Sequence, residues 1–174
     1  MILSFEGKSP LVAKGVFVAP NATLIGDVEV GAGSSVWYQT VIRGDVFPIR
    51  IGCNVNIQDL TMIHVTTGMH ATNIGDNVTI GHGAILHGCT LHDGAFVGMG
   101  AVVMDQAVLG EECMVGARSL VTVGTVIPPR TLAIGSPARV VRDLKEHEIA
   151  MVRASAPHYR NLAERHIRAL DAQA

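Results

Sequence analysis

Aromatic residues and long apolar runs are both scarce in this sequence. Phe, Trp and Tyr make up 4% of the 174 residues, although 48% of the chain is hydrophobic, so small and β-branched aliphatic side chains must fill the core. No apolar run reaches the roughly 18 residues that a transmembrane helix needs. The N-terminal stretch MILSFEGKSP lacks the charged and apolar regions of a secretory signal. We therefore expect a cytoplasmic protein with no membrane partner.

An excess of one charge and a paired set of cysteines are also missing. The 13 Lys and Arg residues nearly balance the 15 Asp and Glu residues, for a formal net charge of −2. A nucleic-acid-binding protein would need a basic stripe, so this class is not expected. Cys53, Cys89 and Cys113 are an odd number at unrelated spacings, which is typical of reduced thiols and not of a disulfide framework.

What the sequence does contain is a repeat with a period of six. Aliphatic residues recur at this period, often followed by Gly or another small residue, at Val18, Leu24, Val30, Val36, Ile42, Ile51, Ile57, Ile63, Ile74, Ile80, Leu86, Leu91, Val97, Val103, Leu109, Val115, Val121 and Ile127. This period fits neither an α-helix nor a half-buried strand. It is typical of a β-solenoid whose short strands turn a corner every six residues. Three sides make a coil of about 18 residues, which predicts a triangular prism of roughly six coils, about 30 Å tall.

The repeat is interrupted by two insertions. Three extra residues fall within 44–48 and five within 65–73. We expect both insertions to form loops that leave the corners of the prism. Loops on a rigid scaffold commonly carry function, so both are candidate functional segments.

The pattern changes after Gly135-Ser136-Pro137, where apolar residues take helical spacing. Asp143 and Glu146 are spaced as a capping box, and Pro157 is expected to kink the helix or split it in two. The sequence therefore predicts an all-β solenoid over residues 1–140 and a helical segment over residues 141–174 that packs along it.

Stacking the coils places histidines on one seam of the prism. Every third hexad lies on the same side, one rung further along, so Arg43, His64 and His87 form a column with a spacing of about 4.8 Å. Asp59 and His82 form a second column on the next side. The pattern gives these columns without giving the handedness of the coil.

His64 and His87 are predicted to lie close enough to bind one metal ion, since Zn²⁺ takes imidazole nitrogens at about 2.0–2.1 Å in tetrahedral geometry. His82 lies at the same height on another side, so it can join them only from a second subunit. Three prisms about a three-fold axis would form three such sites and bring Arg43 of one chain near Asp59 of the next. Three histidines with one open position are typical of a catalytic zinc site, where bound water loses a proton near neutral pH.

Several motifs together resemble those of the gamma-class carbonic anhydrases and their bacterial homologues. They are the hexads, Arg43-Gly44-Asp45, Asn56-Ile57-Gln58-Asp59, His64 and the segment GHGAILHGC at 81–89, and the resemblance covers about residues 10–165. It implies a left-handed parallel β-helix, a homotrimer, and reversible hydration of CO₂ to bicarbonate by a metal-bound hydroxide. The implied metal is Zn²⁺, with Fe²⁺ or Co²⁺ as alternatives.

The resemblance also implies roles for individual residues. It implies His64, His82 and His87 as metal ligands, Gln58 as the residue that orients hydroxide or bicarbonate with Asn56 nearby, Arg43, Asp45 and Asp59 as a subunit-interface network, and Tyr159 over the pocket.

One departure from the family pattern concerns proton export. The family archetype has glutamates in two loops, but here Val46-Phe47 follows Asp45 and the 65–73 loop has no Glu or Asp. Histidine side chains in general titrate near pH 6.5, which makes His70 in that loop a candidate for a substitute proton shuttle. The alternative interpretation of His70 is a solvated loop residue.

Other functions stay open on the sequence alone. The segment Gly135-Ser136-Pro137-Ala138-Arg139 resembles the exit from the prism in hexapeptide acyltransferases, which would use a histidine as general base; it is equally a simple end of the solenoid. A metal-dependent thioesterase and a trimeric scaffold with little activity are further alternatives. We expect His147, His158 and His166 on the solvated surface of the C-terminal helix.

Overall fold

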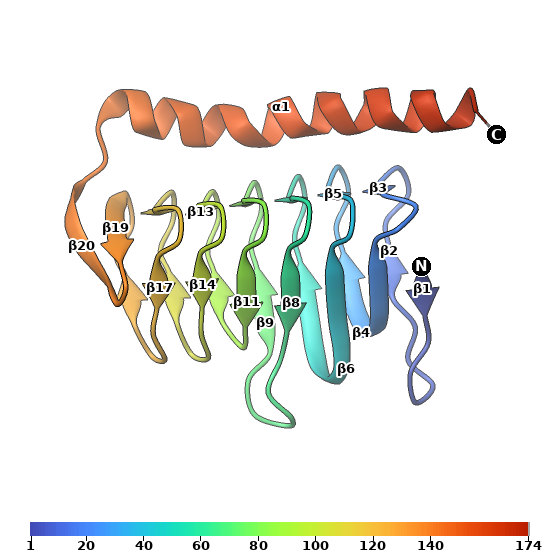
Figure 1. Cartoon of the computed structure of the whole chain (residues 1–174), viewed down its shortest axis with the longest axis horizontal. Helices are drawn as coiled ribbons and strands as arrows, with labels where there is room; N and C mark the ends of the chain where they lie inside the picture. Colours follow the sequence, from blue (N-terminus) through green and yellow to red (C-terminus); the bar gives the residue numbers. More distant parts are fainter. Residues whose placement is uncertain (174) are drawn as a thin grey trace.

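The chain folds into a long triangular prism of short β-strands with one helix lying along it. The computed structural model describes residues 1–173, and Figure 1 shows the prism with its coils stacked side by side and the helix running back over them. The solenoid is a left-handed parallel β-helix, as predicted. It has about seven turns and not six, because Val12 and Ala133 extend the inward hexad positions at the two ends.

The strands form three faces that follow one another around each coil. One sheet joins two of these faces and contains β1 (Ile2–Leu3), β2 (Leu11–Val12), β4 (Thr23–Val30), β6 (Val41–Ile51), β8 (Met62–His64), β9 (Thr72–Ile74), β11 (Ile85–His87), β12 (Thr90–Leu91), β14 (Val102–Val103), β15 (Val108–Leu109), β17 (Leu120–Val121) and β18 (Val126–Ile127). The third face contains β3 (Phe17–Val18), β5 (Ser35–Val36), β7 (Asn56–Ile57), β10 (Thr79–Ile80), β13 (Phe96–Val97), β16 (Met114–Val115), β19 (Thr131–Gly135) and β20 (Ala138–Asp143). The paired strands are parallel except for β19 and β20, which pair antiparallel. Because β20 ends at Asp143, the sheet extends beyond the boundary expected at residue 140.

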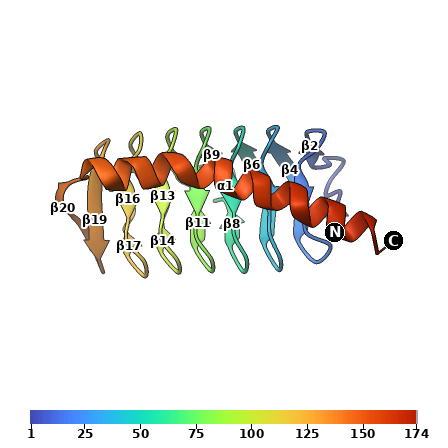
Figure 2. The same cartoon turned by 90° about the horizontal axis from the view of Figure 1, so that it is seen from above.

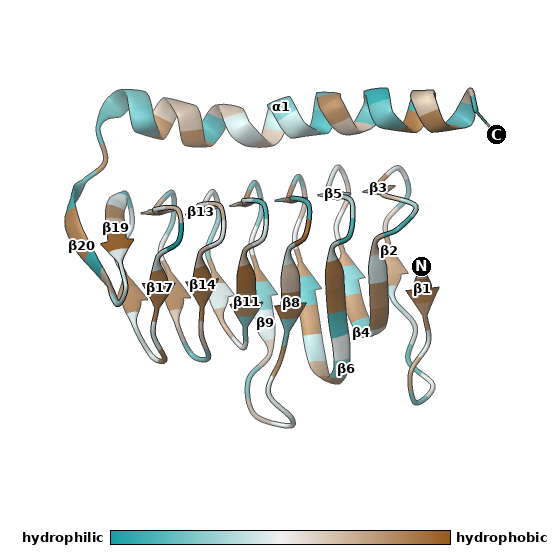
Figure 3. Ribbon diagram, in the orientation of Figure 1, coloured by the Kyte–Doolittle hydropathy of each residue, from teal (hydrophilic) through white to brown (hydrophobic). Residues whose placement is uncertain are grey.

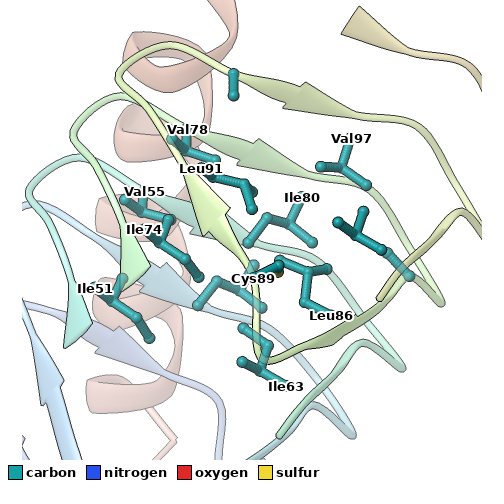
Figure 4. Close-up of a cluster of buried hydrophobic side chains, with 14 of the residues drawn as sticks. Ile51, Val55, Ile63, Ile74, Val78, Ile80, Leu86, Cys89, Leu91 and Val97 are labelled. Atoms are coloured by element: carbon teal, nitrogen blue, oxygen red, sulfur yellow. The ribbon is translucent and has the colours of Figure 1, made fainter. Parts of the chain in front are cut away.

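The inward hexad positions fill the prism. Figure 4 shows aliphatic side chains such as Ile63, Ile80 and Leu86 meeting in the interior, and all three are fully buried. Burial of one such side chain stabilises the fold by about 1.5–3 kcal/mol. Figure 3 shows the same pattern as hydrophobic strands between more polar turns. Small residues follow because the rungs approach closely: a Cβ at Gly98 would lie 2.5 Å from the backbone N of Ala117.

Only one of the two insertions forms a loop. Residues 65–71 of the predicted 65–73 segment form a loop that projects from the prism between β8 and β9, with a bridge between Thr66 and His70 (Figure 1). Thr72 and Asn73 already belong to β9. The prediction for residues 44–48 was wrong, because these residues lie within β6, which runs unbroken from Val41 to Ile51. The mismatch is taken up within β6, because Gly26 of β4 pairs with Gly44 and Val28 pairs with Ile49, so residues 45–48 bulge out of the pairing with β4.

The C-terminal helix α1 (Glu146–Asp171) is a single unbroken element. The capping box predicted at Asp143 is wrong: Asp143 ends β20, and the backbone N–H of Lys145 donates to Glu148 Oε2 at 2.8 Å. Pro157 does not split the helix. Across residues 1–173, no helix is both long and apolar enough to cross a membrane.

An aromatic cluster fixes α1 on the third face, where the helix contacts β3, β5, β7 and β10. Figure 2 shows the helix running along the length of the prism. The ring of Trp37 is buried and lies 5.1 Å from Phe17 and 5.6 Å from Tyr159, centroid to centroid. His166 was expected to be solvated, but its ring lies 4.9 Å from Trp37, and its Nδ1 lies 3.0 Å from the hydroxyl of Tyr38.

Glu112 clamps the start of the same helix to the last coils. Its buried carboxylate accepts hydrogen bonds from Arg153 Nε at 2.5 Å and Arg130 Nε at 2.8 Å. The hydrogen bond from Arg153 lowers the pKa of Glu112, with Arg130 adding to the effect against the opposing cost of burial. The ion pairs therefore contribute stability above the ordinary glutamate pKa, and this contribution is lost as the pH falls through the lowered value.

The Glu112→Gln variant is expected to be less stable than the wild type by about 1–2 kcal/mol at pH 7, because the ion pairs with both arginines are lost. The loss stays this small because the half-exposed arginines are then hydrated by water. The difference should shrink as the pH falls from about 5 towards 3. Urea unfolding at a series of pH values measures it. Glu111→Gln, at the exposed neighbouring residue, is the control and should show no such trend. A difference that stays constant to pH 3 would contradict the account.

The cysteines are unpaired thiols, as expected. Cys53 is exposed, whereas Cys89 and Cys113 are buried. Burial raises the pKa of both buried thiols to about 12, so neither forms a thiolate readily at neutral pH.

Candidate metal centre

Two imidazoles meet at the corner of the prism that follows strands β8 and β11. His64 is the last residue of β8 and His87 the last of β11, and the two are direct partners in the parallel register. This confirms the predicted stacking of their hexads. The side chains turn towards each other, so that His64 Nδ1 lies 3.1 Å from His87 Nε2. Two nitrogens bound to one tetrahedral Zn²⁺ at about 2.05 Å would lie about 3.3 Å apart, so this spacing fits a shared metal ion.

A carboxylate holds the far nitrogen of each imidazole. Asp45 Oδ1 lies 3.1 Å from His64 Nε2, and Asp105 Oδ1 lies 3.0 Å from His87 Nδ1. Ionised carboxylates only accept hydrogen bonds, so these far nitrogens carry the protons. The two facing nitrogens are then both lone-pair acceptors, and a cation between them removes their mutual repulsion. A carboxylate behind each imidazole is the usual arrangement around metal-binding histidines.

The protonation of these groups suits metal binding. Burial lowers the pKa of His64, and together with the nearby charges of Arg43 and His87 it outweighs the raising effect of Asp45. His64 is therefore neutral at pH 7, the form that binds metals. Burial alone would raise the pKa of Asp45, but hydrogen bonds from Arg43 and His64 lower it overall. The pKa of Asp105 is lowered in the same way, against burial, by hydrogen bonds from Thr66 and His87.

His82 lies apart from this pair on another corner. It follows β10, is exposed, and its Nδ1 lies 2.8 Å from Asp59 Oδ2. Within residues 1–173, no group of three His, Cys, Asp or Glu side chains is placed to hold a metal ion. The chain thus brings together two of the three predicted ligands, and the third would have to come from another copy.

The predicted interface residues have partners inside the chain. Arg43 Nη1 contacts Asp45 Oδ2 at 2.5 Å, while Asp59 contacts His82. An Arg43–Asp59 pair between subunits stays a prediction, and its formation would exchange these partners.

The amide of Gln58 is held in one orientation by a chain of hydrogen bonds. Gln58 is buried; its Nε2 donates to Asn56 Oδ1 at 3.0 Å, and its Oε1 accepts from the backbone N–H of His82 at 3.2 Å. Asn56 in turn donates to Thr79 Oγ1, which donates to Ser155 Oγ on α1, both at 2.8 Å. These bonds use one of the two N–H groups of the Gln58 amide and hold the side chain in place. The second N–H is available to donate to a ligand.

A groove begins at these residues and runs between α1 and the third face. It has a volume of about 600 Å³. At one end lie Gln58, His82 and Tyr159, and along it lie the side chains of Met99, Met114 and Met151. We call it the methionine groove. Burial raises the pKa of the Tyr159 hydroxyl, and the charge of Asp59 raises it further, so Tyr159 stays protonated and able to donate.

Asp105 is the site residue that the sequence interpretation missed. It follows His87 by 18 residues, but Leu86 pairs with Val103, so the coil there is 17 residues long and Asp105 lies one place beyond the register partner of His87. The six-residue period alone therefore does not identify it. His70, the predicted shuttle candidate, lies close by, because its Nε2 accepts from Gln106 Nε2 at 2.9 Å. His70 is therefore not simply solvated.

Comparisons with known proteins identify similar chains and a matching family model. The family model for the bacterial transferase hexapeptide (six repeats) matches residues 71–103. The chain is 47% identical over 154 residues to a protein of Methanocaldococcus jannaschii named probable carbonic anhydrase, covering 88% of this chain and 96% of that protein. It is 51% identical over 170 residues to gamma carbonic anhydrase 2, mitochondrial, of Arabidopsis thaliana, covering 95% of this chain but 61% of that relative. The chain thus spans about three fifths of the length of the Arabidopsis relative.

A solved structure gives the same picture. The chain superimposes on a hexapeptide transferase family protein from Anaplasma phagocytophilum with a TM-score of 0.91 and 45% identity, covering 94% of this chain and 96% of that one. Fold and repeat together define a hexapeptide-repeat β-helix protein. Within that class, the chain belongs to the gamma-class carbonic anhydrase family.

Proposed function

We propose that this chain forms a homotrimer that catalyses the reversible hydration of CO₂ to bicarbonate at metal centres between its subunits. The facing nitrogens of His64 and His87, each imidazole backed by a carboxylate, are the observation that carries the proposal. The relatives named carbonic anhydrase support the reaction. In this proposal His82 of a second subunit supplies the third ligand.

Zn²⁺ at such a site lowers the pKa of bound water to about 7 and so supplies a nucleophile at neutral pH. Fe²⁺ or Co²⁺ could fill the same role. The imidazole nitrogens are the donor type that suits these ions.

The other side chains bind and orient the substrate. The leftover N–H of Gln58 donates to an oxygen of CO₂ or bicarbonate, and Asn56 keeps the amide from rotating. The protonated hydroxyl of Tyr159 lines the same end of the groove. Arg43, Asp45 and Asp59 hold the subunit border, and His70 is the candidate for proton export. Localisation in the cytoplasm stays a prediction.

The size of the methionine groove favours a second candidate. At about 600 Å³ it is in the range of pockets for drug-sized ligands and far larger than CO₂ requires. The same metal-assisted chemistry on an acyl thioester would make the protein a thioesterase. A transferase has support from the description of the family model, bacterial transferase hexapeptide, and from the name of the similar protein of Anaplasma phagocytophilum.

The test is stopped-flow CO₂ hydration by zinc-loaded protein, with acyl-CoA hydrolysis assayed on the same sample. We expect CO₂ hydration, and we expect Gln58→Leu to lower kcat/KM about 10–100-fold, since one donor to the reacting oxygens is lost, while the bound zinc is retained. Gln39→Leu, at an exposed residue, is the control. Zinc-loaded protein that hydrolyses thioesters without hydrating CO₂ would replace this proposal by the thioesterase.

A further inference from the structure

We propose that Asp105 is a positioning residue for the metal centre, which fixes the ring of His87 and thereby sets the affinity for Zn²⁺. The inference rests on the proposed function, because it assumes that His87 is a metal ligand. It concerns a carboxylate one coil beyond His87, on the turn after β14 (Val102–Val103).

The contact between Asp105 and His87 involves both carboxylate oxygens. They lie 3.0 Å and 3.2 Å from His87 Nδ1. Because the carboxylate accepts the Nδ1 proton, the lone pair of His87 is confined to Nε2, which is the nitrogen that faces His64. Loss of the carboxylate would free the ring to rotate and to exchange tautomers. Partners of this kind also raise the basicity of the ligand.

Asp105 is itself held in place. Thr66 Oγ1 donates to Asp105 Oδ1 at 2.6 Å. The backbone N–H of the next residue, Gln106, donates to the carbonyl of Gly88 at 2.8 Å. These contacts come from the 65–73 loop and from the turn after β11, so the carboxylate is fixed from two sides.

The residue at position 88 leaves room for this carboxylate. A Cβ at Gly88 would lie 2.2 Å from Asp105 Oδ1, and the backbone of Gly88 has a φ of +55°. Any larger side chain would push the carboxylate away from His87. The same close approach occurs at Gly75, where a Cβ would lie 2.3 Å from Asp93 Oδ1. The glycine therefore makes room for the carboxylate, and the contact with His87 is what distinguishes Asp105.

The experiment measures Zn²⁺ affinity by competition with a chelator of known affinity, on purified full-length protein at fixed pH. We expect Asp105→Asn to weaken Zn²⁺ binding about 10–100-fold, the usual cost of losing such a partner. Metal-free Asp105→Asn should stay folded but unfold at a somewhat lower denaturant concentration than the metal-free wild type, because the ionised carboxylate accepts hydrogen bonds from Thr66 and His87. The Zn²⁺ affinity is therefore measured without denaturant, where both proteins are folded. Thr66→Val, which keeps Asp105 but removes its donor, should weaken binding by a smaller factor and serves if Asp105→Asn does not fold.

Asp93→Asn is the matched control, because Asp93 accepts a backbone N–H from Asp76 at 2.9 Å on an exposed turn and contacts no histidine of the site. Zn²⁺ affinity that is equal in Asp105→Asn, Asp93→Asn and wild type would overturn the inference. Failure of the wild type itself to bind Zn²⁺, Fe²⁺ or Co²⁺ would instead refute the proposed function. The two failures are therefore distinguishable.

Discussion

The His87→Ala variant is expected to purify with less than about one tenth of the zinc of the wild type and to hydrate CO₂ at least 100-fold more slowly. Loss of a residue behind a ligand already costs about 10–100-fold in affinity or activity, and His87 would contact the metal directly. Removal of its ring also leaves the Nδ1 of His64 without its facing nitrogen and Asp105 without its partner. Metal analysis of the purified protein and stopped-flow hydration measure the two effects.

His92→Ala is the matched control for this prediction. His92 is an exposed histidine that lies after β12 and makes no side-chain contact with the site residues. We expect it to keep wild-type zinc content and rate. Full zinc stoichiometry in His87→Ala would show that His87 is not a ligand.

The column of histidines could be predicted because the six-residue period assigns every residue of the solenoid to one side and one coil of the prism. Once Ile63 and Leu86 are assigned to the interior of successive coils, the register of His64 and His87 follows without any tertiary information. The structure confirms this register residue by residue. The same arithmetic leads from His87 to Met104 in the next coil, because Leu86 pairs with Val103. Asp105 lies one place beyond the column and reaches His87 across the turn, a contact that the period does not encode.

Other features could not be derived from the period, because they depend on contacts between distant segments. Residues 44–48 read as a loop, but the long strand β6 pairs with β4 through a local irregularity that the hexad pattern does not encode. Helical spacing predicted α1 correctly, yet neither the partner of His166 nor its packing on Trp37 is visible in the spacing. The capping box is formed by Lys145 and Glu148 instead of Asp143 and Glu146, because Asp143 is the last residue of strand β20.

The position of His82 raises the central question, since it lies away from His64 and His87 in the single chain. If each centre takes His64 and His87 from one subunit and His82 from the next, two inactive variants can repair each other. A subunit with His82→Ala still offers a complete pair, and one with His87→Ala still offers the third ligand. In random trimers made from equal amounts, a site is complete with a probability of about one quarter, by the symmetry of a closed three-fold ring.

The decisive measurement is therefore zinc content and CO₂ hydration after the two variants are unfolded, mixed in equal amounts and refolded together. Each variant alone is expected to be nearly inactive, and the mixture should recover about one quarter of the wild-type values. A mixture of His64→Ala with His87→Ala is the control and should recover nothing, because both ligands must come from the same subunit. No recovery with His82→Ala and His87→Ala, or equal recovery in the control mixture, would contradict a metal centre shared between subunits.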